Sequence, residues 1–206
     1  MPIRTDQAIV LRLTDYSETS QIATLFTAQN GLVRLIAKGS RRSTRKSFSA
    51  GLDLLEYGEV RYAPPRGDAG LGNLAEWTQR DTFSGLRADL LRQYGALYAA
   101  ELTSKLTEEF DPHPGLFTAL LDLLRQLADP ADTAPTPGRP TGTPAAIVRF
   151  QAALLREIGY APILRRCVAC GKPRERGTRA YFSASAGGML CGDCAVSYTH
   201  LRAHET

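Results

Sequence analysis

Two cysteine pairs near the end of the sequence constrain the fold of this chain most strongly. Cys167 and Cys170 form one CxxC pair, Cys191 and Cys194 form the other, and 20 residues separate the pairs. This spacing is typical of a four-cysteine zinc site, in which each tight turn offers two thiolates to one metal ion. Because four sulfur ligands leave no position open for water, we expect the Zn²⁺ to be structural and not catalytic.

Two other interpretations of the cysteines fit less well. A disulfide pair and two thioredoxin-like redox motifs would use the same residues, but no βαβ pattern surrounds either CxxC and the chain has no further cysteine. Gly171 and Gly192 stand where turns around a metal need permissive backbone angles. Between the pairs, residues 181–182 and 189–190 flank a Ser-Ala-Gly-Gly sequence, which predicts a short β-hairpin.

The bulk composition is that of a globular protein with hydrophobic cores. The chain has 206 residues, of which 43% are hydrophobic and 8% aromatic, and this length suits one large domain or two to three small ones. We expect no signal peptide, since the first residues carry early charge and no long apolar run. No stretch reaches the length of a membrane span, so we expect no membrane contact. With the thiols committed to a metal and no secretion signal, we expect a cytoplasmic protein.

The first 80 residues predict a small β-barrel. Five apolar and β-branched runs have the length of strands: residues 7–13, 20–26, 32–37, 52–62 and 71–77. Asn30-Gly31 predicts a hairpin turn between the second and third runs, and Gly58 predicts a bulge or bend inside the fourth. An OB-fold is the leading candidate. An SH3-like barrel satisfies the same pattern, and periodicity does not separate the two.

From about residue 83 the hydrophobic period becomes helical. A first amphipathic helix is predicted with an apolar face made of Leu86, Leu90, Tyr94, Leu97, Tyr98, Leu102, Leu106 and Phe110. A second helix is marked by Leu116, Phe117, Leu120, Leu121, Leu123, Leu124 and Leu127. A third carries Ile147, Phe150, Leu154, Leu155 and Ile158 on one face, ends at Gly159 as a C-cap and is expected to pack on the other two.

These patterns predict an α+β chain with three parts and a tail. We expect an OB-fold domain over residues 1–80 and a helical domain over residues 81–163. Within the helical domain, residues 129–144 are rich in proline, threonine and glycine and predict a flexible linker. A four-cysteine zinc module follows over residues 164–196. Residues 197–206 show no periodicity and are interpreted as a truncated or non-native tail.

Positive charge is concentrated in two stretches, although the net charge is only +4. Residues 38–46 carry five cations and no acid, and with Arg34 they supply the candidate DNA contacts Arg34, Lys38, Arg41, Arg42, Arg45 and Lys46. The second stretch supplies Arg165, Arg166, Lys172, Arg174, Arg176 and Arg179 against one acid, Glu175. Two such patches favour a polyanionic partner, most often nucleic acid. The alternative for either patch is a solvated loop without a partner.

Aromatic residues add little to this interpretation. Tyr16, Phe48, Tyr57 and Tyr62 are candidates for stacking on bases, but core packing competes as the role of each. Because no dense aromatic platform is evident, we expect binding through phosphate contacts with little sequence preference.

No arrangement in the sequence resembles an active site. His113 lies beside Glu108, Glu109 and Asp111, but this spacing matches no metal loop and indicates an exposed helix end. A zinc-dependent nuclease or hydrolase would need a further metal or an open coordination position, and the sequence offers neither. We therefore expect a protein that is not an enzyme. A zinc-stapled adaptor that docks proteins without binding DNA directly stays open as an alternative.

Several segments together resemble the RecO family of bacterial recombination mediators. They are residues 7–11 (QAIVL), residues 17–20 leading into residues 25–27, and residues 31–42, which end in the sequence AKGSRR. Residues 150–160 (FQAALLREIGY) resemble the helix before the zinc site, and residues 181–183 and 187–191 resemble the hairpin and second cysteine pair. The resemblance covers nearly all of residues 1–196, in the family's order of OB domain, helical domain and zinc module.

The resemblance implies a function in recombination and DNA repair. Proteins of this family bind single- and double-stranded DNA, anneal complementary strands and act with RecR. Together these proteins help RecA to displace single-strand binding protein from DNA. Carried onto this sequence, Lys38, Arg41 and Arg42 would contact DNA and the four cysteines would bind zinc. The resemblance also implies association with the bacterial nucleoid.

Overall fold

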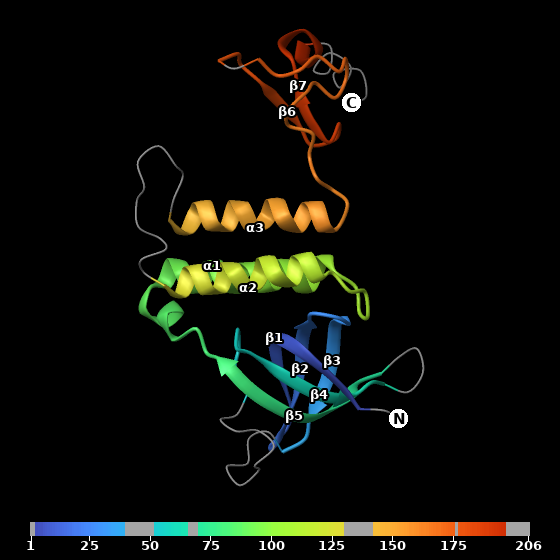
Figure 1. The fold of residues 1–206 in the computed structure, drawn as a ribbon, viewed down its shortest axis with the longest axis vertical. Helices are drawn as coiled ribbons and strands as arrows, with labels where there is room; N and C mark the ends of the chain where they lie inside the picture. Colours follow the sequence, from blue (N-terminus) through green and yellow to red (C-terminus); the bar gives the residue numbers. More distant parts are fainter. Residues whose placement is uncertain (1–2, 40–51, 66–69, 130–141, 176, 197–206) are drawn as a thin grey trace. The chain divides into compact units, whose positions relative to one another are not determined.

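The computed structural model describes residues 3–39, 52–65, 70–129, 142–175 and 177–196 of the chain. The chain divides into two compact units, residues 1–154 and residues 155–206. Figure 1 shows the elements coloured along the sequence. The first unit holds a β-barrel and most of the helical residues, and the second unit holds the cysteines. The domain boundaries drawn from the sequence stay predictions.

Five strands form the barrel of the first unit: β1 (Arg4–Ser17), β2 (Ser20–Thr27), β3 (Gly31–Ala37), β4 (Tyr57–Ala63) and β5 (Gly72–Asp81). They close in the order β1-β2-β3-β5-β4, and β1 completes the barrel by pairing with β4. All neighbours are antiparallel except β3 and β5, whose short parallel pairing joins Leu35 to Gly72. This strand order is that of an OB-fold, so the leading prediction is confirmed.

The barrel core explains why these residues form strands. Alternate residues of β1 to β5 point inward and are buried, among them Val10, Leu25, Leu35, Val60 and Trp77. The predicted Asn30-Gly31 hairpin joins β2 to β3, with Gly31 at a φ of 67°. The irregularity predicted at Gly58 also occurs, but the extra residue lies opposite, in β5.

Gly58 is needed because the core comes close to its backbone. A Cβ atom there would lie 2.5 Å from the carbonyl oxygen of Thr78 and 2.8 Å from Cζ2 of Trp77. Distances this short do not occur for real Cβ atoms, so any side chain would force the strands or the indole ring to move.

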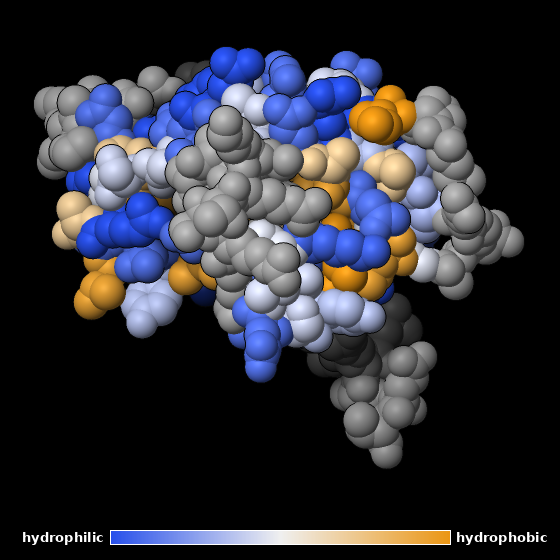
Figure 2. Space-filling view, turned by 90° about the horizontal axis from the view of Figure 1, so that it is seen from below, coloured by the Kyte–Doolittle hydropathy of each residue, from blue (hydrophilic) through white to orange (hydrophobic). Residues whose placement is uncertain are grey.

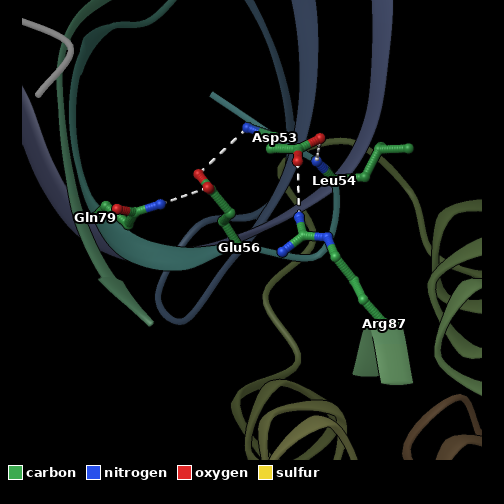
Figure 3. Close-up of polar contacts among 5 residues, drawn as sticks. All are labelled: Asp53, Leu54, Glu56, Gln79 and Arg87. Carbon is green, nitrogen blue, oxygen red and sulfur yellow. Dashed lines mark hydrogen bonds and ion pairs between the residues drawn. The ribbon is translucent and has the colours of Figure 1, made fainter. Parts of the chain in front are cut away.

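The fourth strand is shorter than predicted. It begins at Tyr57 rather than Leu52, because Leu55 adopts a left-handed φ of 66° that an extended strand cannot contain. Side chains hold this turn in place (Figure 3): Glu56 accepts hydrogen bonds from the Asp53 amide and from the Gln79 side chain. Arg87 donates to Asp53 over 2.8 Å, which connects the turn to the segment before α1. Apolar content alone therefore overestimated the strand.

The first helical segment differs most from the prediction. A short 3₁₀ helix, η1 (Ser84–Ala88), ends at extended Asp89, whose side chain caps α1 (Leu90–Leu106) by accepting from the Arg92 amide. The predicted apolar face is only partly buried: Leu86 is buried in η1, Leu97 and Leu102 are half-buried, and the other five residues are exposed. Leu90 is 70% exposed and Tyr94 is 65% exposed. The helix instead buries its small residues: Gly95, Ala96, Ala99, Ala100 and Thr103.

The other two helices agree better with the sequence patterns. In α2 (Pro114–Ala128) all seven predicted apolar residues are buried. The next helix, α3 (Thr143–Glu157), buries Phe150 and Leu154 as predicted and is followed by Gly159 at a φ of 82°. Figure 1 shows the three helices lying alongside one another. Thr143 and Pro144 belong to α3 and not to the predicted linker, whose residues 130–141 lie outside the described residues.

Contacts between side chains place α3 beside both other helices. Gln151 donates to the Tyr98 hydroxyl of α1 over 2.8 Å, and Arg149 donates to Gln126 of α2 over 3.1 Å. A Cβ atom on Gly95 would lie 2.8 Å from Cδ1 of Ile147, so the two helices meet closely at this glycine. In the described part of the chain, none of the helices is both long and apolar enough to span a membrane.

The second unit contains the predicted hairpin, β6 (Tyr181–Ser183) and β7 (Gly188–Leu190). Its turn includes Gly187 at a φ of 72°, and Met189 donates to the Ile163 carbonyl over 2.8 Å, which adds a third segment to the hairpin. Gly171 has the predicted left-handed backbone, with a φ of 75°. Gly192 does not, and it begins the short helical turn that carries the second cysteine pair.

Candidate nucleic-acid interface and metal centre

A row of three side chains crosses the outer face of the barrel. Arg12 of β1 pairs with Thr24 of β2, and Thr24 pairs with Arg34 of β3. Residues directly opposite one another in antiparallel strands point to the same face, so both arginines lie on one surface with a hydroxyl between them. Arg12 and Arg34 are exposed. Sequence reasoning missed Arg12, because it stands alone between apolar residues of a predicted strand.

A bulge puts Arg12 on this face. Val10 pairs with Leu25 and Arg12 pairs with Thr24, so Leu11 is an extra residue of β1. Val10 and Leu13 pack in the core, while Arg12 and Thr14 point outward. Without the bulge, the alternation that starts at Val10 would turn Arg12 toward the core. The sequence gives little indication of the bulge.

The next row continues the same surface. Ile22 of β2 pairs with Ile36 of β3, and Thr14 of β1 stands on the other side of Ile22. Lys38 follows β3 at the position that continues the alternation of Arg34 and Ile36, and it is exposed. Two of the predicted contacts, Arg34 and Lys38, thus flank an aliphatic strip. The remaining four of the first patch, Arg41, Arg42, Arg45 and Lys46, lie outside the described residues.

The aromatic candidates have different surroundings. Tyr62 is fully buried in the barrel core and is not available to stack on a base. Tyr57 donates its hydroxyl to Gln7 over 2.9 Å and lies beneath the Arg125 guanidinium. Tyr16, near the end of β1, is 61% exposed. Phe48 lies outside the described residues. Among the described candidates, Tyr16 is the one whose ring is open to a base.

Figure 2, a view from below Figure 1, shows a surface that is mostly hydrophilic with small hydrophobic patches between.

A groove of about 390 Å³ lies on the barrel surface beside the end of α1. Its lining comes from β1, β2, β3, α1 and the α1–α2 loop: Arg12, Thr14, Ile22, Thr24, Leu32, Arg34, Ser104 and Glu109. Two arginines and three hydroxyl groups around one groove can bind an anion.

The four cysteines of the second unit come together as predicted. Their sulfur atoms all lie within 4.8 Å of one another. The backbone forms a tight turn at each pair: Gly171 donates to the Cys167 carbonyl and Ala195 donates to the Cys191 carbonyl, both over 2.9 Å. No disulfide joins them, and the sulfurs of Cys170 and Cys191 are 3.8 Å apart. This donor set fits one tetrahedral, thiophilic metal ion.

Hydrogen bonds within the cluster shift the pKa values of two of the thiols in opposite directions. Hydrogen bonds from the backbone amides of Cys191 and Cys170 lower the pKa of Cys167 to about 6. Hydrogen bonds to Cys191 and Cys170 instead raise the pKa of Cys194 to about 12. Neighbouring thiolates repel one another, so four can be ionised together only if a divalent cation offsets their charge.

The second predicted basic patch surrounds this cluster. Lys172, Arg174 and Arg179 line a groove of about 280 Å³ beside β7. Arg165 and Arg166 are exposed, and the Arg174 amide donates to the Arg165 carbonyl over 2.8 Å. Lys172 lies 3.6 Å from Asp193, whose charge raises the pKa of the lysine. Arg176 lies outside the described residues. The structure thus brings three of these cations together, and their role in DNA binding stays a prediction.

An OB-fold barrel with a cationic strand face, followed by helices and a four-cysteine cluster, defines an OB-fold protein with a metal-binding module. Two family models match the chain: "Recombination protein O N terminal" over residues 1–83 and "Recombination protein O C terminal" over residues 87–205. The chain belongs to the RecO family of DNA repair and recombination proteins.

Similar curated proteins cover most of the chain. The DNA repair protein RecO of Rhodopirellula baltica is 36% identical over 195 residues, which span 94% of this chain and 68% of the relative. That of Anaeromyxobacter dehalogenans strain 2CP-C is 38% identical, over 91% of this chain and 68% of the relative. That of Bacillus pumilus is 33% identical, over 91% and 67%.

Proposed function

We propose that this chain is a recombination mediator that binds single- and double-stranded DNA without sequence specificity and anneals complementary strands. The observation that carries the proposal is the pair of exposed arginines, Arg12 and Arg34, that flank Thr24 on the OB barrel of a RecO-family chain. Strand faces of OB barrels are a common site of oligonucleotide binding. We assign the barrel, residues 1–80, as the main DNA-binding domain.

Binding rests on neutralising phosphates. Arg12, Arg34 and Lys38 supply exposed positive charge on one surface, and the predicted contacts Arg41, Arg42, Arg45 and Lys46 follow Lys38 directly in the sequence. Each phosphate contact releases condensed counterions, which favours binding of any sequence. Annealing follows from the same charges, because cations that contact two strands lower their mutual repulsion. The second patch around the cysteines is the candidate for a further DNA contact.

Cys167, Cys170, Cys191 and Cys194 would hold a Zn²⁺ ion. Bound zinc supplies no reactivity in such a site; it crosslinks the two turns of a small unit with few buried apolar residues. We place the zinc module at residues 164–196 and assign the chain no catalytic step.

The family relationship supports a proposal about the protein partners. We propose that the chain acts with RecR to load RecA onto DNA coated by single-strand binding protein, in the cytoplasm and at the nucleoid. These partners come from the resemblance of the sequence to the RecO family, and the strand face described above provides the DNA contact that such a reaction needs.

Fluorescence anisotropy of labelled single-stranded and duplex DNA across a salt series tests the proposal. Binding to both DNAs, with affinity falling steeply as salt rises, supports it and counts the phosphates contacted. Arg41→Gln with Arg42→Gln should weaken binding to all sequences. The matched control, Arg61→Gln with Arg80→Gln, removes equal charge from β4 and β5. Absence of binding at low salt would overturn the proposal and favour the protein adaptor.

A further inference from the structure

The groove between the barrel and the α1–α2 loop contains an acidic side chain among basic ones. Glu109 of the loop lies 3.5 Å from the guanidinium of Arg34. Both belong to the first unit. Arg34, Arg12 and the hydroxyl groups of Thr14, Thr24 and Ser104 line the same groove. Among the described residues of this lining, Glu109 is thus the one carboxylate in a surface that otherwise suits an anion.

The backbone of the loop fixes Glu109 at this place. β5 pairs with β3 only at Leu35 and Ile36, which leaves the first residues of β3 with an open edge. The loop fills that edge: Glu109 forms a parallel bridge with Leu32, and the Phe110 amide donates to the Leu32 carbonyl over 3.0 Å. Glu109 therefore stands opposite Leu32, two residues before Arg34 in β3, because of main-chain pairing and not because of its charge.

The ion pair itself is weak. Its N···O distance of 3.5 Å is longer than a good charge-assisted hydrogen bond, and the side chains are 51% and 37% exposed. A guanidinium has five N–H donors, so most of those on Arg34 remain available to another anion. Arg12 takes part in none of the ion pairs found between described residues.

Arg12 and Arg34 are spaced to share one stretch of DNA backbone. They stand two strands apart, about 10 Å between backbones, and their long side chains can close on one phosphate or on two successive ones. Phosphate matches two guanidinium groups better than a single carboxylate does, because it offers more oxygen acceptors.

We infer that Arg12 and Arg34 form a phosphate-binding subsite for single-stranded DNA, and that Glu109 occupies this subsite until the DNA backbone displaces it. The inference rests on the proposed function, since it refines how the same strand face binds DNA. Glu109 lowers the affinity of the free protein for DNA, and DNA binding releases its carboxylate from Arg34. Binding on the barrel is thereby coupled to the loop that connects α1 and α2.

The test compares two neighbouring carboxylates. Glu109→Gln removes the competitor, and Glu108→Gln removes the same charge one residue away, where the carboxylate lies outside the groove lining. Binding is measured by anisotropy with a labelled oligothymidylate of about 12 nucleotides. We expect Glu109→Gln to tighten binding about two- to five-fold, the size expected for release of an exposed ion pair. Glu108→Gln should have a smaller effect.

A double-mutant comparison connects the effect to Arg34. Glu109→Gln should no longer tighten binding when Arg34→Ala is already present. Arg12→Ala should weaken binding and lower the slope of log affinity against log salt by about one. Thermal melts of each variant establish that it is folded.

The outcomes separate this inference from the proposed function. If the unsubstituted chain binds DNA but Glu109→Gln and Glu108→Gln behave alike, or the gain persists without Arg34, competition at the subsite is overturned and the mediator proposal stands. If the unsubstituted chain binds no DNA at low salt, the proposed function fails and this inference fails with it.

Discussion

Gly31 lies directly against the backbone of Asp111: a Cβ atom on Gly31 would stand 2.0 Å from the Asp111 carbonyl oxygen. Gly31 starts β3 and Asp111 belongs to the α1–α2 loop. The glycine therefore serves two purposes, a hairpin turn at a φ of 67° and the docking of the loop that carries Glu109.

Gly31→Ala should consequently be costly. The left-handed backbone and the overlap with a main-chain atom together should lower the free energy of unfolding by about 2–4 kcal/mol. Urea unfolding followed by far-UV circular dichroism measures this. Gly159→Ala is the control, since Gly159 has a φ of 82° but no atom within 4 Å of its added Cβ. Gly159→Ala should lower the free energy of unfolding only through the left-handed backbone, by about 1–2 kcal/mol. Equal losses for Gly31→Ala and Gly159→Ala would contradict the close contact between Gly31 and the α1–α2 loop.

Removal of one thiol should release the metal. Wild-type protein purified without chelators should contain about one zinc per chain by mass spectrometry, and Cys191→Ser should contain little and melt at a lower temperature. Ala169→Ser is the control, because it places a hydroxyl between Cys167 and Cys170 without removing a ligand. A Cys191→Ser variant that keeps its zinc and melts like the parent would show that Cys191 is not a zinc ligand.

Glu56 should make stability depend on pH. Burial, the largest effect, raises the pKa of this carboxyl above 4.5, although hydrogen bonds from Asp53 and Gln79 oppose the shift. A folded-state pKa above the unfolded value favours the protonated form in the folded protein. The stability contributed by Glu56 is therefore greatest below pH 4.5 and is lost as the pH rises through the folded-state pKa.

Urea unfolding followed by Trp77 fluorescence, at pH values from below 4.5 to neutral, tests this. Relative to Glu56→Gln, the wild type should lose stability as the pH rises. Glu18→Gln, which removes an exposed carboxylate, corrects for the change in net charge. If the difference in free energy of unfolding between wild type and Glu56→Gln stays constant with pH, burial does not shift the pKa of Glu56.

The burial of the small residues of α1, instead of its large apolar ones, predicts unequal effects of two substitutions. Ala99 is fully buried, so Ala99→Leu should overpack the helix interface and lower the free energy of unfolding by about 1–3 kcal/mol. Tyr94→Ala removes a much larger side chain from a position that is 65% exposed and should change stability by less than about 0.5 kcal/mol. Urea unfolding measures both changes in the free energy of unfolding. A larger loss for Tyr94→Ala than for Ala99→Leu would support the apolar face predicted from the sequence.

Much of the architecture follows from short-range patterns. The CxxC spacing predicted the cysteine cluster, Asn30-Gly31 predicted the β2–β3 hairpin, and the leucine repeat predicted both the extent and the buried face of α2. In each case one local requirement decides the outcome: two ligands from one turn, a positive φ, or a single stripe of large apolar residues.

The tertiary structure decided what depends on neighbours distant in sequence. α1 has a stripe of large apolar residues and a stripe of small ones, and it buries the small one where it contacts α2, β1 and β2, with α3 close to Gly95. The bulge at Leu11 turns Arg12 outward, and main-chain pairing with Leu32 brings Glu109 to Arg34. Sequence patterns by themselves determined the type and approximate place of the main strands and helices, and the cysteine cluster. The order of the barrel strands and the residues that line the groove beside α1 depend on register and packing, in which each partner is set by the rest of the fold.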